Sequence, residues 1–229
     1  MPGFEYIDNK EKKAVINLFN EGGILFAHGF DNIRKKYHTR EFEKKFSKKF
    51  KIKYSLAVSS GTAAIKIALK ALGVRAGDEV ITQSFNFIAT IEAILDVGAI
   101  PKIVNIDNTL NMDLNELKKN ITKKTKVILP VHMLGVSAEI EKIIKIAKKY
   151  KIKVLEDNCE AIGGKYYKQY LGTIGKAGVF SFDFGKTITT GEGGMITTNN
   201  KKLDKYSREY HDHGHENNPD LPRGRDTKT

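Results

Sequence analysis

From residue 53 to residue 157, short β-rich runs alternate with helical segments, and this alternation constrains the fold more than any other feature of the sequence. The expected strands are residues 54–59, 79–82, 100–106, 126–131 and 153–156. The expected helices between them are residues 62–72, 87–97, 113–120 and 138–150. Strands and helices that alternate at this spacing form βαβ units, whose strands are parallel. The sequence therefore predicts an α/β fold, in which a mostly parallel sheet lies between two layers of helices as a three-layer α/β/α domain.

The segments on either side of this alternation have different patterns. Residues 9–20 and 34–50 have helical periodicity, so residues 1–50 are expected to form an N-terminal helical segment. After Asp157, short strands are expected near 166–170, 177–182 and 194–198, and a helix near 200–211. We expect residues 51–212 to form one large domain. Residues 213–229 are polar and without periodicity, so we expect a loop that leads to a C-terminal domain absent from this chain.

The formal net charge of +12 raises the question of a nucleic-acid partner. Within residues 42–50 and 140–149, however, the lysines alternate with apolar residues at helical spacing, which is typical of the solvated face of an amphipathic helix. We therefore expect no nucleic-acid partner. No apolar run reaches the roughly 18 residues of a membrane helix, the first residues show no signal-peptide pattern, and the single cysteine cannot form an internal disulfide. These features predict a cytoplasmic protein with no membrane partner.

Ligands of open α/β sheets bind beyond the carboxyl ends of the strands, so the residues at those ends are the candidates for function. The first candidate is the turn Ser59-Ser60-Gly61-Thr62, between an expected strand and an expected helix. A small, glycine-containing turn lets a phosphate approach the free N–H groups at a helix start. The alternative is that Ser60 is an ordinary helix N-cap.

The second candidate is Asp157, in the run Leu155 to Glu160 that ends another expected strand. A buried aspartate at that edge needs a cationic partner, and a protonated pyridine nitrogen would serve. The alternative is again a helix N-cap.

The third candidate is Lys186, which follows the aromatic run Phe180-Ser181-Phe182-Asp183-Phe184-Gly185 and precedes a glycine-rich turn. Partial desolvation would lower the pKa of a lysine there and free its amine as a nucleophile. The alternative is an exposed loop lysine. In this order, a phosphate turn, a strand-end aspartate and a lysine are the anchors that pyridoxal 5′-phosphate requires.

The sequence resembles the DegT-type sugar aminotransferases, which have the aspartate aminotransferase fold (fold type I). The most specific stretch runs from Glu156 to Asn200, and the motifs SSGTAA, SFNFIAT and VHMLG occur at the expected intervals. The resemblance implies that the phosphate of pyridoxal phosphate is bound by Ser60, Gly61, Thr62 and Ser181. It also implies that Phe87 stacks on the pyridine ring, that Asp157 pairs with the ring nitrogen and that Lys186 forms the imine. Glu160 stands where the family commonly has Gln or His, near the cofactor's 3-hydroxyl.

The resemblance further implies an aminotransferase that moves an amino group from glutamate or glutamine to a keto sugar. The sugar would be nucleotide-linked or an eight-carbon acidic sugar, used in cell-surface polysaccharide biosynthesis. The resemblance also implies a homodimer, in which each cofactor site is completed by the neighbouring subunit. Family members are also much longer than this chain, since they carry a smaller C-terminal domain.

Three other functions stay open at the level of sequence. One is a deoxysugar dehydratase of the same family: EDNCEA resembles that branch, but its members carry His at the position of Lys186. Another is a truncated and catalytically silent chain that at most binds the cofactor or a partner. The third is a nucleic-acid-binding module, which rests on charge alone.

Overall fold

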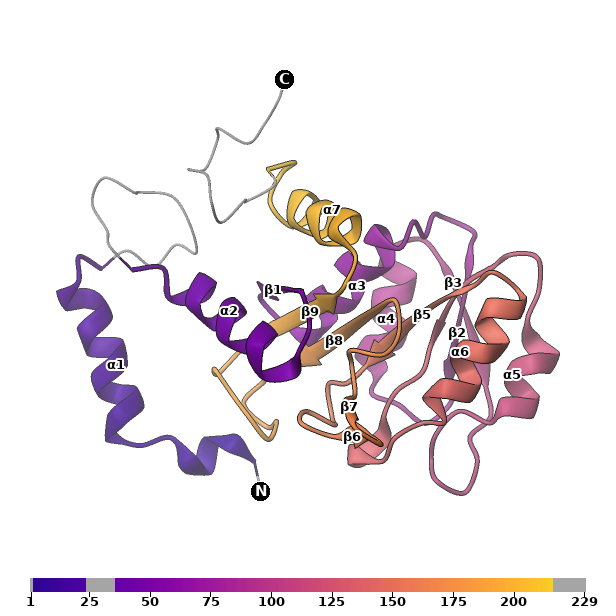
Figure 1. Cartoon of the computed structure of the whole chain (residues 1–229), viewed down its shortest axis with the longest axis horizontal. Helices are drawn as coiled ribbons and strands as arrows, with labels where there is room; N and C mark the ends of the chain where they lie inside the picture. The colour runs from indigo at the N-terminus through magenta and orange to yellow at the C-terminus, as the bar shows by residue number, and fades with distance from the viewer. Residues whose placement is uncertain (1, 24–35, 216–229) are drawn as a thin grey trace.

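A computed structural model describes residues 2–23 and 36–215, and its centre is a seven-stranded sheet of order β1-β9-β8-β5-β4-β2-β3 (Figure 1). The strands are β1 (Tyr54–Val58), β2 (Glu79–Gln83), β3 (Ile100–Val104), β4 (Thr125–Leu129), β5 (Lys153–Asp157), β8 (Ala177–Ser181) and β9 (Gly194–Thr198). Neighbouring strands from β8 through β5, β4 and β2 to β3 are parallel, whereas β9 runs antiparallel to both β8 and β1. The prediction of a mostly parallel sheet is therefore confirmed.

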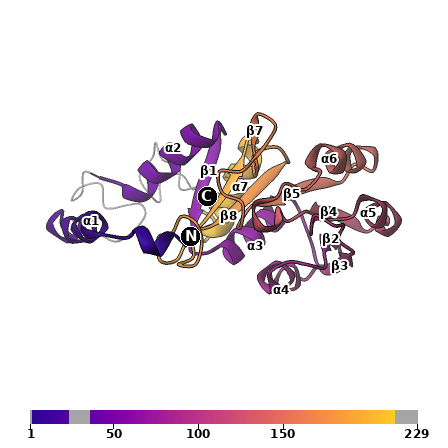
Figure 2. The same ribbon diagram turned by 90° about the horizontal axis from the view of Figure 1, so that it is seen from below.

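Helices cover both faces of this sheet, as Figure 2 shows. The helices α3 (Gly61–Ala71), α4 (Ile88–Asp96) and α7 (Lys201–His211) pack on one face. The helices α2 (His38–Phe50), α5 (Leu114–Asn120) and α6 (Ile140–Lys149) pack on the other. The three-layer α/β/α arrangement predicted from the alternation is confirmed.

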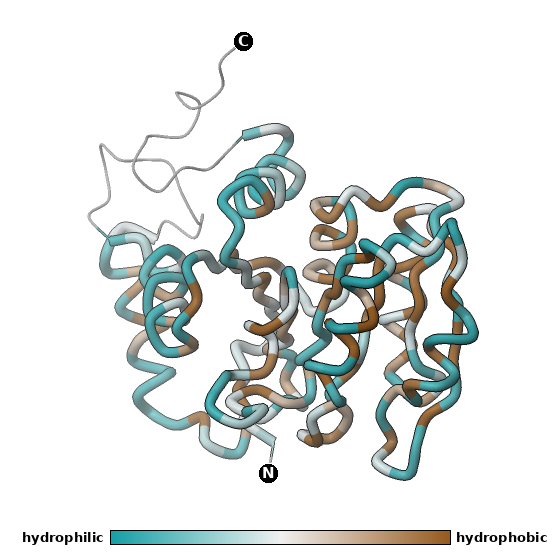
Figure 3. The backbone as a smooth tube through the Cα atoms, turned by 45° about the vertical axis from the view of Figure 1, so that its right-hand side comes forward, coloured by the Kyte–Doolittle hydropathy of each residue, from teal (hydrophilic) through white to brown (hydrophobic). Residues whose placement is uncertain are grey.

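The strands are apolar on both sides because both sides are covered. In β4, Val127 and Leu129 contact the first layer of helices, while Ile128, between them, contacts the second. All three side chains are fully buried. Figure 3 shows the same division along the chain, with hydrophobic residues in the strands and hydrophilic ones along the outer helices.

The N-terminal part of the chain lies beside this domain. A short 3-10 helix, η1 (Gly3–Tyr6), is followed by α1 (Asn9–Asn20), which begins at a capping box formed by Asp8 and Glu11. No residue of α1 is buried, and in Figure 1 the helix projects away from the sheet. The helix predicted over 34–50 begins only at His38; residues 34–35, like 216–229 of the predicted C-terminal loop, lie outside the described residues.

Two smaller features complete the fold. The strand region expected near 166–170 is a hairpin of two short strands, β6 (Lys165–Tyr166) and β7 (Gln169–Tyr170), which pair with each other. Elsewhere in the domain, the buried guanidinium of Arg208 joins α7 to α2 and β1. It contacts the Glu43 carboxylate at 3.3 Å and donates to the Ser55 carbonyl at 2.8 Å.

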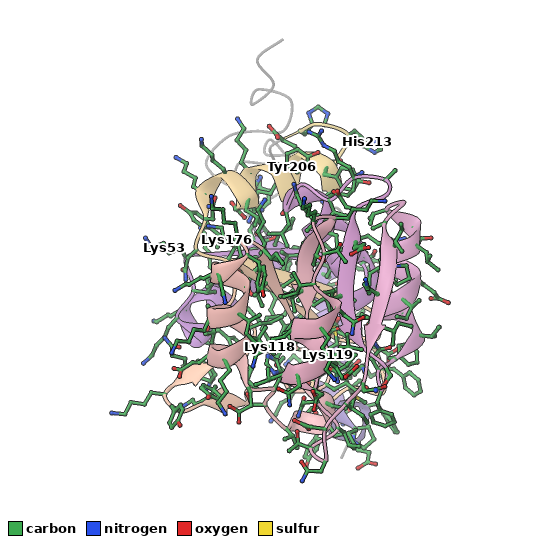
Figure 4. All side chains as sticks on the ribbon, turned by 90° about the vertical axis from the view of Figure 1, so that its right-hand side faces the viewer. Lys53, Lys118, Lys119, Lys176, Tyr206 and His213 are labelled. Carbon is green, nitrogen blue, oxygen red and sulfur yellow. The ribbon has the colours of Figure 1, made fainter. Side chains whose placement is uncertain are left out.

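The basic residues are distributed over separate elements. In Figure 4, Lys118 and Lys119 extend from α5, whereas Lys53 and Lys176 come just before two strands. Burial lowers the pKa of Lys153, and the nearby charge of Lys126 lowers it further. Lys153 and Lys126, near the starts of β5 and β4, therefore repel each other. In the part of the chain that the structure describes, no helix is long and apolar enough to span a membrane.

Candidate active site

A cavity of about 420 Å³ opens at the carboxyl ends of the parallel strands. Its walls come from the segments that follow β1, β2, β4, β5 and β8, so sequence-distant loops meet at one edge of the sheet. Every residue predicted for the site lines this cavity: Ser60, Gly61, Thr62, Phe87, Asp157, Glu160, Ser181 and Lys186. The structure thus brings all the candidates together.

The phosphate-type turn is the start of α3. The Ser60 hydroxyl accepts a hydrogen bond from the Ala63 N–H at 3.1 Å, so the N-cap interpretation is correct. It does not compete with anion binding, because the N–H groups of Gly61 and Thr62 have no acceptor within the helix. A Cβ on Gly61 would lie 2.9 Å from the Ser181 Cβ and 3.0 Å from the Cys159 Sγ. Glycine is therefore required here, where the end of β8 and the segment after β5 pack against the helix start.

Asp157 is the last residue of β5 and is 3% exposed. Its carboxylate accepts hydrogen bonds from the Thr90 hydroxyl at 3.0 Å and from the Cys159 N–H at 3.1 Å. The next element along the chain is the strand β6, so the alternative of a helix N-cap is wrong. Among the described residues, no lysine, arginine or histidine forms an ion pair with this carboxylate. A buried, unpaired carboxylate on a cavity wall favours a cationic group in the cavity.

Lys186 lies in the turn after β8, and its side chain is 23% exposed. The amine Nζ is 3.4 Å from Oε1 of Glu160 and 5.9 Å from the ring centroid of Phe87. The interpretation of an exposed loop lysine therefore does not hold. Lys186 is the only lysine or arginine among the described residues that line the cavity.

Glu160 uses only one of its carboxylate oxygens. Oε1 is near Lys186, whereas Oε2 is buried and has no hydrogen-bond partner in the described part of the chain. A buried acceptor without a donor is unfavourable, so this oxygen marks a place where a ligand could donate a hydrogen bond.

A buried hydrogen-bond network around His132 and Glu156 holds the backbone of Asp157 in place. The His132 N–H donates to the Asp157 carbonyl at 3.0 Å, and Nε2 of the His132 ring lies 3.0 Å from the Glu156 carboxylate. The ring atom Nδ1 accepts the Ala138 N–H, so the proton of a neutral ring is on Nε2 and is donated to Glu156. Glu156 also accepts the backbone N–H groups of three residues in the segment before β8, which are Gly172, Ile174 and Gly175. This network fixes the end of β5 and hence the direction of the neighbouring Asp157.

Sequence reasoning missed several residues of the cavity, among them Thr90, Cys159, Asp183 and Glu192. Thr90 ends the SFNFIAT motif and lies one turn after Phe87, so its helical spacing could have indicated it. Cys159 has no comparable signal, because a single cysteine in the sequence indicates only that an internal disulfide is absent. Burial raises the pKa of its thiol well above the usual range, and the Asp157 charge raises it further.

The residues of the cavity fit pyridoxal phosphate. The start of α3, where Gly61 leaves no side chain in the way, accommodates an anion. Asp157 accommodates a cation. The oxygen of Glu160 that has no partner among the described residues accommodates a hydrogen-bond donor. The amine of Lys186 faces the same space. An anionic group, a cationic ring nitrogen, a hydroxyl and an aldehyde on one small molecule would satisfy all four features.

Comparisons with known proteins agree with this geometry. The family profile described as the DegT/DnrJ/EryC1/StrS aminotransferase family matches residues 26–224. GDP-perosamine synthase of Escherichia coli O157:H7 is 44% identical over 170 residues, which are 74% of this chain and 47% of that protein. The X-ray structure of an aminotransferase from Psychrobacter cryohalolentis has a TM-score of 0.85 at 34% identity, and the match covers 91% of this chain and 52% of that one.

A second solved neighbour is named for a different activity. It is the E coli GDP-4-keto-6-deoxy-D-mannose-3-dehydratase with bound hydrated PLP, at a TM-score of 0.77 and 32% identity, covering 89% of this chain and 51% of that one. The chain thus spans about half the length of these relatives.

Proposed function

This chain belongs to the DegT/DnrJ/EryC1/StrS aminotransferase family, and on that premise we propose that it is the large, cofactor-binding part of a sugar aminotransferase that uses pyridoxal 5′-phosphate. One observation carries the proposal. A buried carboxylate without a cationic partner among the described residues, Asp157, lines the same cavity as the amine of Lys186 and the start of α3.

Each residue of the cavity then has a role. Gly61 and Thr62 bind the phosphate through the helix start, with Ser60 and Ser181 beside them. Phe87 lies against the ring, and Asp157 keeps the ring nitrogen protonated. When bound, the cofactor supplies an aldehyde that condenses with amines and a ring that takes up electrons. Glu160 lies beside Lys186, and we assign it to the side of the cofactor that carries the 3-hydroxyl.

Lys186 has two tasks in this proposal. Its amine first holds the cofactor covalently, as an activated lysine nucleophile does. When free, the same amine would take the proton from the donor's Cα as general base and return it as general acid. The partial burial of Lys186 and the aromatic ring of Phe87 near its amine limit the access of water to this group.

The family supports a proposal for the substrates as well. We propose glutamate or glutamine as the amino donor and a keto sugar as the acceptor, either nucleotide-linked or an eight-carbon acid, for cell-surface polysaccharide biosynthesis. The similarity to GDP-perosamine synthase supports a nucleotide-linked sugar as the acceptor. We also propose a cytoplasmic enzyme, on the composition argument made above.

We propose that the enzyme acts as a homodimer. Near the cavity, Phe87 is 65% exposed, Ile88 57% and Phe184 61%. Exposed apolar residues that gather at one place favour a protein partner. A second copy of the chain would cover them and complete the site.

Borohydride reduction tests the function directly. After addition of pyridoxal phosphate, reduction should attach the cofactor to the peptide that contains Lys186. Lys186→Ala should abolish the label. Lys186→Arg should abolish it as well, because a guanidinium stays protonated and cannot condense with an aldehyde. The control is Lys168→Ala, which removes a lysine from the exposed turn between β6 and β7 and should not change the label.

The outcome also separates the alternatives. A label on another lysine would contradict the assignment of Lys186. The absence of any bound cofactor would favour the silent or binding-module interpretations. A cofactor-loaded protein that dehydrates a keto sugar, and yields no amino sugar with a donor present, would favour the dehydratase.

A further inference from the structure

The N-terminal residues cross over the turn that carries Lys186, although the two segments are far apart in the sequence. The Gly3 N–H donates a 2.7 Å hydrogen bond to the carbonyl of Lys186. Gly3 is buried, and a Cβ at this position would lie 2.7 Å from the Thr187 carbonyl oxygen and 2.9 Å from that of Lys186. The contact is therefore backbone against backbone, and only glycine allows it at this distance.

A second contact flanks the first. The Phe4 ring packs against the Phe184 ring, with 5.6 Å between their centroids and 30° between their planes. Phe184 is two residues before Lys186, and Thr187 directly follows it. The N-terminal segment thus contacts the Lys186 turn on both sides of the lysine.

The hydrogen bonds that the turn makes by itself are local in sequence. The Lys186 N–H donates to the Asp183 carbonyl at 3.0 Å, and the Gly185 N–H donates to the Asp183 side chain at 3.0 Å. Both bonds lie within residues 183–186. The other end of the turn is joined to the segment after β8, since the Thr190 N–H and the Thr189 hydroxyl both donate to the Phe182 carbonyl at 3.0 Å. The bond from Gly3 is the contact that joins the Lys186 backbone to a distant segment.

We propose that Gly3 and Phe4 are positioning residues for Lys186: they hold the backbone of its turn so that its amine faces the cavity. The inference rests on the proposed function in so far as Lys186 is the reactive lysine. Neither residue lines the cavity, so both act through the turn.

We call the contacts of Gly3 and Phe4 with the Lys186 turn the clamp. Hydrogen exchange of the protein without cofactor tests the clamp independently of any chemistry. Gly3→Ala places a methyl group against two carbonyl oxygens, and Phe4→Ala removes the ring contact. In both variants, we expect amides of residues 183–190 to exchange about tenfold faster, because local opening becomes easier. Phe4→Tyr keeps the ring and should exchange like the wild type. The matched control is Phe19→Ala, which removes an exposed ring from α1.

The rate of cofactor attachment then tests positioning. With pyridoxal phosphate and borohydride, we expect Gly3→Ala and Phe4→Ala to label Lys186 about tenfold more slowly, since small displacements of a reacting group have large effects on rate. The thermal unfolding midpoint should not change, because η1 lies outside the core of the domain. Phe4→Tyr should restore the wild-type rate.

The possible results are distinguishable. Unchanged exchange in both variants would overturn the clamp, and faster exchange with wild-type labelling would overturn its role in positioning. A lowered unfolding midpoint in step with slower labelling would also overturn it, since the effect would then be general. If even the wild type is not labelled, the proposed function fails, and the exchange comparison still decides whether the clamp exists.

Discussion

The Thr90 hydroxyl donates a 3.0 Å hydrogen bond to the Asp157 carboxylate, and both residues are almost completely buried. Thr90 acts on the site through this carboxylate, because its hydroxyl is hydrogen-bonded to Asp157. The Lys186 amine contacts a different side chain, Glu160. The bond from Thr90 fixes the orientation of a charge that, in our proposal, pairs with the cofactor's ring nitrogen.

Changing either residue should weaken cofactor binding, by different amounts. Asp157→Asn removes the charge opposite a buried cation, which we expect to cost about 3 kcal/mol, or roughly a hundredfold in affinity. Thr90→Val removes one hydrogen bond at nearly constant volume, for about 1 kcal/mol. Titration of pyridoxal phosphate followed by absorbance measures both. An Asp157→Asn variant that binds as tightly as the wild type would contradict the ion pair.

The Cys159 thiol should report on the cavity. Burial, and then the charge of Asp157, raises the pKa of this thiol above its ordinary value of 9.0. The thiolate is the reactive form, so alkylation by a maleimide at pH 7.5 should be at least about tenfold slower than in the unfolded chain. The rate should rise as the pH increases above 9. Since the chain has a single cysteine, mass spectrometry reads the modification directly.

Cofactor binding adds a control to this measurement. Pyridoxal phosphate should slow the alkylation further, because Cys159 lines the same cavity as Lys186. A thiol that reacts at the rate of a free cysteine at pH 7.5, with or without the cofactor, would contradict both the raised pKa of Cys159 and its place on the cavity wall.

Glu160→Gln should strengthen cofactor binding. The buried Oε2 of Glu160 lacks a donor in the described part of the chain, and an ionised carboxylate repels an anionic ligand. Glutamine removes the charge and keeps an acceptor oxygen for the ligand's hydroxyl, so we expect about a threefold to tenfold gain in affinity. Asp183→Asn, a charge removal elsewhere on the cavity wall, is the comparison. A loss of affinity in Glu160→Gln alone would mean that the carboxylate itself is needed, either protonated or through its contact with Lys186.

Arg208→Met should destabilise the fold without touching the site. The Arg208 side chain is 11% exposed and contacts both Glu43 and Asp204, which would be left buried without this cation. Breaking such a pair costs about 3–5 kcal/mol in the free energy of unfolding. Urea unfolding measures it. Lys205→Met, whose ion pair with Glu209 is at 3.7 Å and half-exposed, should cost at most about 0.5 kcal/mol. Equal losses in the two variants would refute the special role of Arg208.

Much of this architecture could be predicted from the sequence because it depends on the pattern of apolar and polar residues within short segments. The spacing of apolar runs sets the strands and helices from Tyr54 to Asp157, and parallel strands place their carboxyl ends at one edge. That is why Ser60, Asp157 and Lys186 can be assigned to one site from their order and spacing along the chain. The roles given to Phe87, Glu160 and Ser181 rest on the family resemblance, and they stay proposals.

Other features depend on contacts between distant segments, which no local pattern encodes. The position of β9 between β1 and β8 follows from packing of the whole sheet, and the burial of Arg208 follows from the meeting of α2 with α7. The boundaries predicted at residues 50, 51 and 212 stay predictions.

The order of strands and helices along the chain was enough to assign residues to the carboxyl edge of the sheet, because βαβ units make their strands parallel and the apolar runs set where each strand ends. The tertiary structure alone decided what surrounds them: the hydrogen bond from Thr90 to Asp157, the unpartnered oxygen of Glu160 among the described residues and the contact of Gly3 with Lys186. The physical reason is that hydrogen bonds and close packing act over a few ångströms, so they depend on distances that only the folded chain sets.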